Sequence, residues 1–191
     1  PCSASAPLGY DEYGDPIVTA TPVPDGQAAA VTPAHSSYYS QAADTDSIDG
    51  WPKGPGIEAQ AAVLMDVNTE AVLYSKNADT QLYPASITKI MTAMLALKYG
   101  NMDDTVTISQ ENVTLESGSQ VAGFQAGDQV TMDQLLHCLL VYSANDAASA
   151  IAEHIGGTTD KFVEMMNSFA AELGCTGTHF TNPHGLQDEN H

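Results

Sequence analysis

The segment PASITKIMTAMLALKYG, residues 84–100, combines a helical pattern with almost no charge. Its apolar side chains recur at the spacing of one helix face, at Ile87, Ile90, Met91, Met94 and Leu95. This spacing predicts a helix over residues 86–99 that Gly100 ends. The opposite face holds small or hydroxyl side chains and one lysine, Lys89, with Lys98 at the far end. Because a surface helix would carry several charges there, we expect this helix to be buried on all sides.

Lys89 is an unfavourable residue at the start of a buried helix. A cation in the first turn faces the positive end of the helix dipole, which costs about 0.3–1 kcal/mol, and burial disfavours its charged form further. Ser86 lies three residues earlier on the same face, so a neutral Lys89 could act as a general base beside a nucleophile. Free N–H groups of the first turn would suit an oxyanion hole. The ordinary alternative is Ser86 as a helix N-cap and Lys89 in solvent, but the uncharged helix favours chemistry.

A second polar motif, Ser143-Ala144-Asn145, lies within VYSANDAASAIAEHI, residues 141–155. It separates two apolar segments that are expected to be helices, so a short loop would hold a hydroxyl and an amide with little freedom. The ordinary alternative is that Asn145 or Asp146 caps the second helix.

The remaining patterns predict strands first and helices afterwards, which is typical of an α+β fold with an antiparallel sheet. Two apolar runs joined by a turn at Asn68-Thr69 predict a hairpin. Thr131 and Gln134 form a capping-box pattern at the start of a helix. Further segments complete the prediction, with strands at 104–109 and 178–182 and helices at 132–142, 146–155 and 160–173.

The first 52 residues differ from the rest of the chain. Eight of the ten prolines precede Gly56, mixed with Ala, Ser, Thr and Asp, and no apolar period persists. Such a segment cannot bury enough apolar surface to offset the entropy of ordering it. We therefore expect residues 1–52 to be a disordered linker and residues 53–191 to be the folded domain.

The charge and the cysteines exclude several classes of function. The chain has a formal net charge of −19 and only five basic residues, so phosphate backbones and anionic lipids would be repelled. The three cysteines, Cys2, Cys138 and Cys175, lack zinc-ligand spacing, and no metal site is expected. Pro1 before Cys2 fits a lipidated cysteine poorly. No run of eighteen apolar residues predicts a membrane span, so any membrane attachment would need an anchor outside this chain.

The two polar motifs together resemble a known family. PASITKIMTA and YSANDAA look like the S-x-x-K and S-x-N signatures of the serine D-alanyl-D-alanine carboxypeptidases, the low-molecular-mass penicillin-binding proteins. The similarity extends over about residues 57–191, through AAVLMDVNTEAVLYSKNAD, GFQAGDQVTMDQLLHCLL and FVEMMNSFAAELGCTGTHFTNPHGL. It implies a β-lactamase/transpeptidase-like fold, in which an antiparallel sheet meets a helical cluster.

The resemblance also implies a role for each motif residue. Ser86 would be the acylated nucleophile and Lys89 its base. Ser143 would relay a proton to the leaving D-alanine, and Asn145 would bind the substrate amide and help to hold Lys89. NPHGL, residues 182–186, would be scaffold around the cleft, with His184 as a structural residue. No cofactor is implied.

The implied function is the removal of the terminal D-alanine from peptidoglycan stem peptides through an acyl-enzyme on Ser86. The protein would act outside the cytoplasmic membrane of a bacterium, in the cell envelope or secreted, and β-lactams would inhibit it.

One departure from the family pattern is the absence of a K-T-G motif among the 191 residues. In the family this motif lies on a strand that binds the substrate carboxylate and supplies an oxyanion donor, and losing one such donor costs about 10²–10³ in rate. We therefore expect a chain truncated before the motif, with an incomplete C-terminus and impaired activity.

Two alternatives stay open. A class A-like β-lactamase shares S-x-x-K, but the stretch after S-A-N, CTGTHFTNPHGL, offers no glutamate to direct the deacylating water. The other alternative is a non-catalytic protein that binds the cell wall or another partner and has a decayed site.

Overall fold

The computed structural model describes residues 35–191, and the chain divides into two compact units between Thr80 and Gln81. Each unit is described by itself. The prediction of a linker over residues 1–34, and Cys2 within it, lie outside the described residues.

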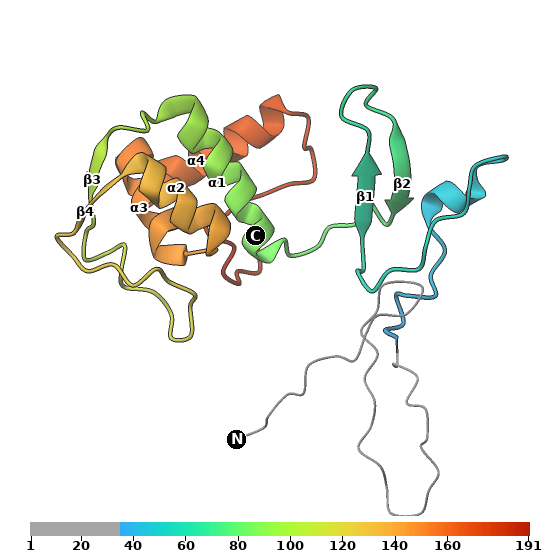
Figure 1. Ribbon diagram of the computed structural model, residues 1–191, viewed down its shortest axis with the longest axis horizontal. Coiled ribbons are helices and arrows are strands. Elements are labelled where there is room, and N and C mark those ends of the chain that lie inside the picture. Colours follow the sequence, from blue (N-terminus) through green and yellow to red (C-terminus); the bar gives the residue numbers. More distant parts are fainter. Residues whose placement is uncertain (1–34) are drawn as a thin grey trace, which may run out of the picture. The chain divides into compact units, whose positions relative to one another are not determined.

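The first unit contains the predicted hairpin. Strand β1 (Ala62–Met65) pairs antiparallel with β2 (Val72–Lys76), with Val63 opposite Ser75 (Figure 1). The connecting turn is closed by the Asp66 carboxylate, which accepts hydrogen bonds from the backbone N–H groups of Asn68 and Thr69. A short polar side chain that bonds to the backbone two and three residues ahead favours such a turn. The hairpin is confirmed.

Residues 35–52, which their composition assigns to the linker, have defined structure in this unit. They include a short 3-10 helix, η1 (Asp44–Ser47), which packs on β2. The ammonium of Lys76 is fully buried and donates to the carbonyls of Tyr38, Ile57 and Ala59 at 2.5, 3.0 and 3.0 Å. A buried cation needs such acceptors, so this side chain ties the backbone at Tyr38 and at residues 57–59 to strand β2. The composition of residues 35–52 could not predict this ordered structure, because the acceptors of Lys76 are backbone carbonyls, which every residue carries.

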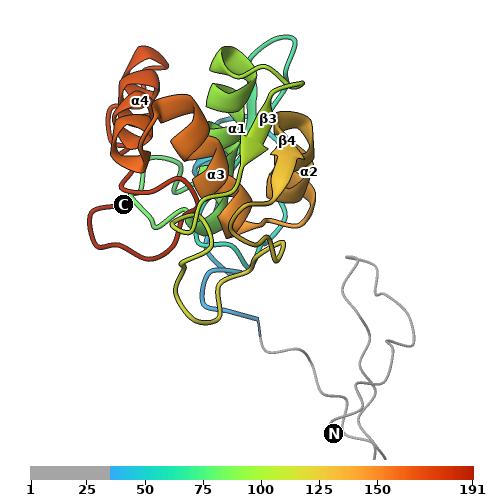
Figure 2. The ribbon, with the colours of Figure 1, turned by 90° about the vertical axis from the view of Figure 1, so that its left-hand side faces the viewer.

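The second unit is a cluster of four helices with a two-stranded sheet (Figure 2). The helices pack on one another around a core of alanine together with leucine, isoleucine, valine, methionine and phenylalanine. Strands β3 and β4 pair antiparallel, with Val106 opposite Val130. The elements are β3 (Thr105–Thr107), β4 (Gln129–Thr131), α1 (Thr88–Tyr99), α2 (Met132–Val141), α3 (Asn145–Gly156) and α4 (Thr159–Glu172).

Most of the predicted elements of this unit are confirmed. The capping box forms as expected: Gln134 N–H donates to Thr131 Oγ1 at 3.2 Å, and Thr131 N–H donates to Gln134 Oε1 at 2.9 Å. Strand β4 is an addition to the prediction, because it is only three residues long and too short to show a strand-like alternation.

The strand predicted at 178–182 is wrong, because these residues form neither a strand nor a helix. The backbone of Phe180 bonds instead to one side chain of α4. Its N–H donates to Asn167 Oδ1 at 2.8 Å, and its carbonyl accepts from Asn167 Nδ2 at 2.8 Å. An amide side chain thus supplies the donor and acceptor that a neighbouring strand would supply.

The expectation that α1 is buried on all sides is also wrong. Its buried face combines small residues and Lys89 with Met91 and Leu95, whereas Ile90 is 57% exposed and Ile87, just before the helix, is 68% exposed. Helix α1 packs against α2, α3 and α4. Small side chains allow helices to approach closely, so the fit to three neighbours, and not hydrophobicity alone, decides which face of α1 is buried. The buried residues of α1 are Thr88, Lys89, Met91, Thr92, Ala93, Leu95 and Ala96.

Candidate active site

Ser86 and Lys89 meet at the start of α1. Ser86 belongs to a 3-10 turn, η2 (Ala85–Ile87), and is exposed, whereas Lys89 is 3% exposed. The two residues are three apart, and their Oγ and Nζ atoms lie 3.0 Å from each other. An accessible hydroxyl therefore contacts a buried amine.

The second partner of Lys89 is a backbone carbonyl, the oxygen of His184, which lies 2.9 Å from Nζ. No ion pair among residues 35–191 includes Lys89. Burial lowers the pKa of Lys89, because a desolvated ammonium without a carboxylate partner is disfavoured. A neutral Lys89 could donate an N–H to His184 and accept the proton of Ser86.

The NPHGL segment, residues 182–186, bonds to the helix that carries Lys89. Thr92, which follows Lys89 by three residues, donates its hydroxyl to the carbonyl of Pro183 at 2.6 Å. Asn182 Oδ1 accepts from Gly185 N–H at 2.7 Å, which closes the turn. The expected role of this segment as scaffold did not include the His184 carbonyl, because every residue carries a carbonyl and no pattern marks one as a lysine partner.

The imidazole of His184 is held neutral in this turn. Leu186 N–H donates to its Nδ1 at 3.2 Å. Burial, and then the charges of Lys89 and His191, lower the pKa of His184 to about 4. The side chain is thus a neutral acceptor for the backbone above this pH.

We expect the protein to lose stability as the pH falls from about 6.5 to about 4, in part through His184. In this window His184 binds a proton in the unfolded chain but stays neutral in the folded protein. The free energy of unfolding therefore rises with pH. His184→Asn would keep an acceptor near Nδ1 and remove the titration. The free energy of unfolding, measured against pH, should then change less steeply in this window. An unchanged slope would contradict this role.

Ser143 and Asn145 lie on the turn between α2 and α3. Ser143 has a left-handed backbone with φ 59°, and Asn145 begins α3 and is 5% exposed. The N-cap of α3 is Ala144, without a side-chain cap bond, so neither Asn145 nor Asp146 is the cap. Within residues 35–191, no hydrogen bond joins the side chain of Ser143 or Asn145 to Ser86 or Lys89.

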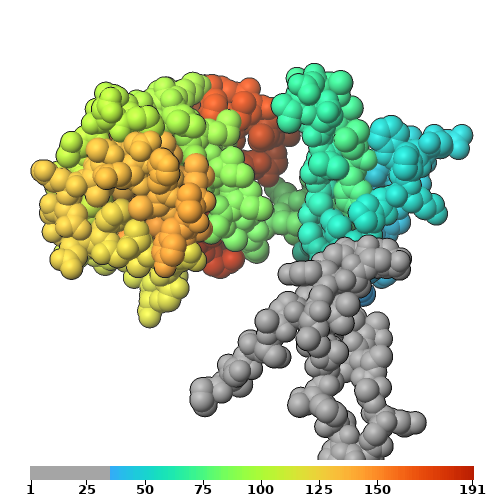
Figure 3. Space-filling view, viewed as in Figure 1, coloured from blue at the N-terminus to red at the C-terminus, as the bar shows by residue number. Residues whose placement is uncertain are grey.

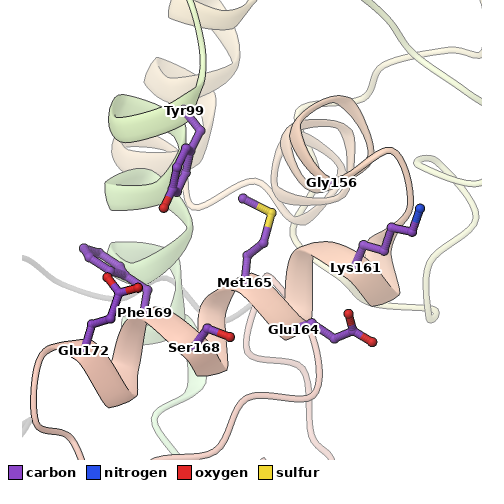
Figure 4. Close-up of a pocket in the computed structure, with 8 residues that line it drawn as sticks. All are labelled: Tyr99, Gly156, Lys161, Glu164, Met165, Ser168, Phe169 and Glu172. Carbon is purple, nitrogen blue, oxygen red and sulfur yellow. The ribbon is translucent and has the colours of Figure 1, made fainter.

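Two concavities of the described chain lie away from these four residues. The larger, about 430 Å³, lies between the C-terminal end of α1 and α4, where Tyr99, Met165 and Phe169 line it (Figure 4). The other, about 260 Å³, is lined by Asn112, Glu153 and His154 among others. Ser86 is at the opposite end of α1 from Tyr99, so the larger concavity is separate from the candidate site.

The described residues offer no cluster of three potential metal ligands. Over the same part of the chain, every helix is too short or too polar to cross a bilayer.

The sequence profile of the D-alanyl-D-alanine carboxypeptidase family matches residues 50–191, about three quarters of the chain. The chain belongs to this family. Over 139 residues it is 42% identical to the D-alanyl-D-alanine carboxypeptidase DacF of Bacillus subtilis, a match that covers 70% of this chain and 35% of the relative. Over 142 residues it is 42% identical to DacA of Haemophilus influenzae, with 71% of this chain and 36% of the relative covered.

Solved structures of the family share the fold. Penicillin binding protein 5 from Haemophilus influenzae is similar with a TM-score of 0.66 and 41% identity, over 72% of this chain and 42% of that one. Penicillin binding protein 6B from Escherichia coli is similar with a TM-score of 0.66 and 37% identity, over 73% of this chain and 47% of that one. The predicted α+β, transpeptidase-like fold is thereby confirmed. The chain spans about a third of the length of the curated relatives it matches, and neither the β-lactamase nor the non-catalytic alternative is favoured.

Proposed function

We propose that the protein is a serine D-Ala-D-Ala carboxypeptidase with Ser86 as its nucleophile. The main support is the contact between the exposed Ser86 hydroxyl and a buried Lys89 amine, which has no acidic partner among residues 35–191. This is the arrangement that an activated serine needs. The names of the relatives support the substrate, a peptide that ends in D-alanyl-D-alanine.

Acylation would begin when Lys89 takes the Ser86 proton and Oγ attacks the carbonyl carbon of the penultimate D-alanine. The peptide bond to the last residue breaks. Ser143 passes a proton to the departing amine and takes one back from Lys89, which leaves Lys89 neutral again. Water then hydrolyses the ester on Ser86 and releases the shortened peptide, with Lys89 again serving as the base. Asn145 would bind the substrate amide.

The proposed setting is the bacterial cell envelope, outside the cytoplasmic membrane, where peptidoglycan stem peptides are found. A β-lactam would acylate Ser86 in the same way and leave slowly. Two of the similar solved structures are named penicillin binding proteins, and their names support this part of the proposal.

The test is the intact mass of the protein, as its organism produces it, before and after incubation with benzylpenicillin. We expect one penicilloyl group per chain, none on Ser86→Ala, and D-alanine release from a pentapeptide that stops with the same substitution. Ser168→Ala, an exposed serine of α4, is the matched control and should label fully. An unlabelled natural protein, or a labelled Ser86→Ala, would reject the proposal.

A further inference from the structure

Asp146 is a buried carboxylate whose partners are backbone N–H groups. It is 1% exposed, and no ion pair of residues 35–191 includes it. Oδ1 accepts from Ala122 and Ala147 at 2.9 Å, and Oδ2 accepts from Gly123 at 3.0 Å and Phe124 at 3.3 Å. Bonds from several N–H groups can satisfy a buried carboxylate.

Three of these four donors lie outside helix α3. A carboxylate that only stabilised the start of α3 would bond to the first N–H groups of its own helix, and here Ala147 alone does so. The other donors belong to the segment 120–124, which precedes α2 in the chain. The yellow atoms around this segment adjoin the golden-orange atoms of α2 in Figure 3. Asp146 therefore joins a loop to the turn that carries Ser143.

Gln120, at the start of the same segment, contacts the residues on both sides of Ser143. Its carbonyl accepts from Asn145 N–H at 2.8 Å. Its side-chain amide donates to the carbonyl of Tyr142. The segment thus bonds to Tyr142, Asn145 and Asp146, and Ser143 lies between the first two.

The turn at Ser143 needs such support. A left-handed backbone is unfavourable at a residue other than glycine, and φ of Ser143 is 59°. Two backbone bonds close the turn onto α2, because the N–H groups of Tyr142 and Ala144 both donate to the Cys138 carbonyl, at 3.3 and 3.1 Å. Strained conformations persist when surrounding contacts fix them.

We propose that Asp146 is a positioning residue, which holds the segment 120–124 against the turn 142–145 and so fixes Ser143 and Asn145 for acylation. The chemical part rests on the function proposed above. The mechanical part, coupling between the segment and the turn, stands on these contacts alone. The two parts are tested separately.

Hydrogen exchange of the natural protein tests the coupling. Asp146→Asn presents an amide NH₂ to backbone donors, so the N–H groups of Ala122–Phe124 should exchange faster. If the segment supports the turn, Asn145 N–H should also exchange faster. Asp160→Asn, an exposed residue in the first turn of α4, should change neither. Faster exchange at 122–124 with Asn145 unchanged would overturn the proposal, whether or not the protein reacts with penicillin.

The rate of benzylpenicillin acylation tests the chemical role. We expect Asp146→Asn to lower the limiting acylation rate by about 10²-fold, with little change in the concentration for half-saturation. Loss of folded protein alone would reduce the fraction of chains labelled and leave the rate of the remainder unchanged. That result would overturn the role.

Gln120→Ala is a second variant that tests the same role if Asp146→Asn, which changes a buried side chain, does not fold. Gln120 is exposed, so its removal should preserve the fold and slow acylation by a smaller factor. Gln125→Ala, in the same loop, removes an exposed side chain that bonds to no residue of the described chain. It should acylate like the natural protein. Equal rates for Gln120→Ala and Gln125→Ala would contradict the role of the segment. If benzylpenicillin does not label the natural protein, the proposed function is rejected. The coupling between the segment 120–124 and the turn 142–145 is then tested by hydrogen exchange alone.

Discussion

Lys89→Ala is expected to slow the acylation of Ser86 by on the order of 10²–10⁴-fold, the usual contribution of a general base. The 3.0 Å contact between Nζ and Oγ provides the path for the proton. Substrate affinity should change less than the rate, because proton transfer occurs only on the way to the transition state. Rapid mixing with a chromogenic penicillin would measure the rate.

The pH dependence distinguishes a base from a structural lysine. Burial lowers the pKa of Lys89 from its ordinary value of 10.5, so acylation should rise with pH and reach half its maximum below 10.5. Lys89→Ala should lose this rise. Lys89→Arg, which keeps a cation but cannot lose its proton, should be as slow as Lys89→Ala. A fast arginine variant, or the same pH rise without Lys89, would remove Lys89 from the mechanism.

The same shift has a consequence for stability. The unfolded chain keeps the lysine proton to a higher pH than the folded protein does. Between the two pKa values the unfolded state therefore binds more protons, and the free energy of unfolding rises with pH through this group. Keeping Lys89 in the site thus costs stability at neutral pH.

Gly185→Ala is expected to lower the free energy of unfolding by about 2–5 kcal/mol. A left-handed backbone, φ 85° here, costs an alanine roughly 1–2 kcal/mol, and forcing an atom into a packed site adds about 1–3 kcal/mol. A Cβ atom would lie 1.8 Å from the Ala85 carbonyl oxygen and 3.0 Å from Thr88 Oγ1. The backbone of Ala85 or of Gly185 would have to move.

Acylation should fall in this variant too, because Ala85 precedes Ser86 directly. Gly118→Ala is the matched control: its φ is 87°, and a Cβ atom there meets nothing within 4 Å. Gly118→Ala should lose only the stability that a left-handed backbone costs an alanine, because its Cβ atom meets no other atom. Urea unfolding of both variants would give the difference. Equal losses of stability would mean that the approach of Gly185 to Ala85 is not constrained.

The elements that could be predicted from the sequence are those whose causes are local. The hairpin turn depends on the bonds of Asp66 to residues two and three ahead. The start of α2 depends on Thr131 and Gln134, and the Ser86–Lys89 contact depends on a spacing of three along one turn. Each cause acts within a few residues, so a linear pattern contains it.

Contacts between distant segments could be found only in the folded chain. Packing buried the face of α1 that carries Lys89 and exposed Ile87 and Ile90. Packing also placed the carbonyl of His184 within hydrogen-bonding distance of Lys89, and the N–H groups of residues 122–124 within hydrogen-bonding distance of Asp146. The segment 178–182 bonds to the side chain of Asn167 where a strand was expected. In each of these hydrogen bonds one partner is a backbone group, which every residue carries, so no sequence pattern could single it out.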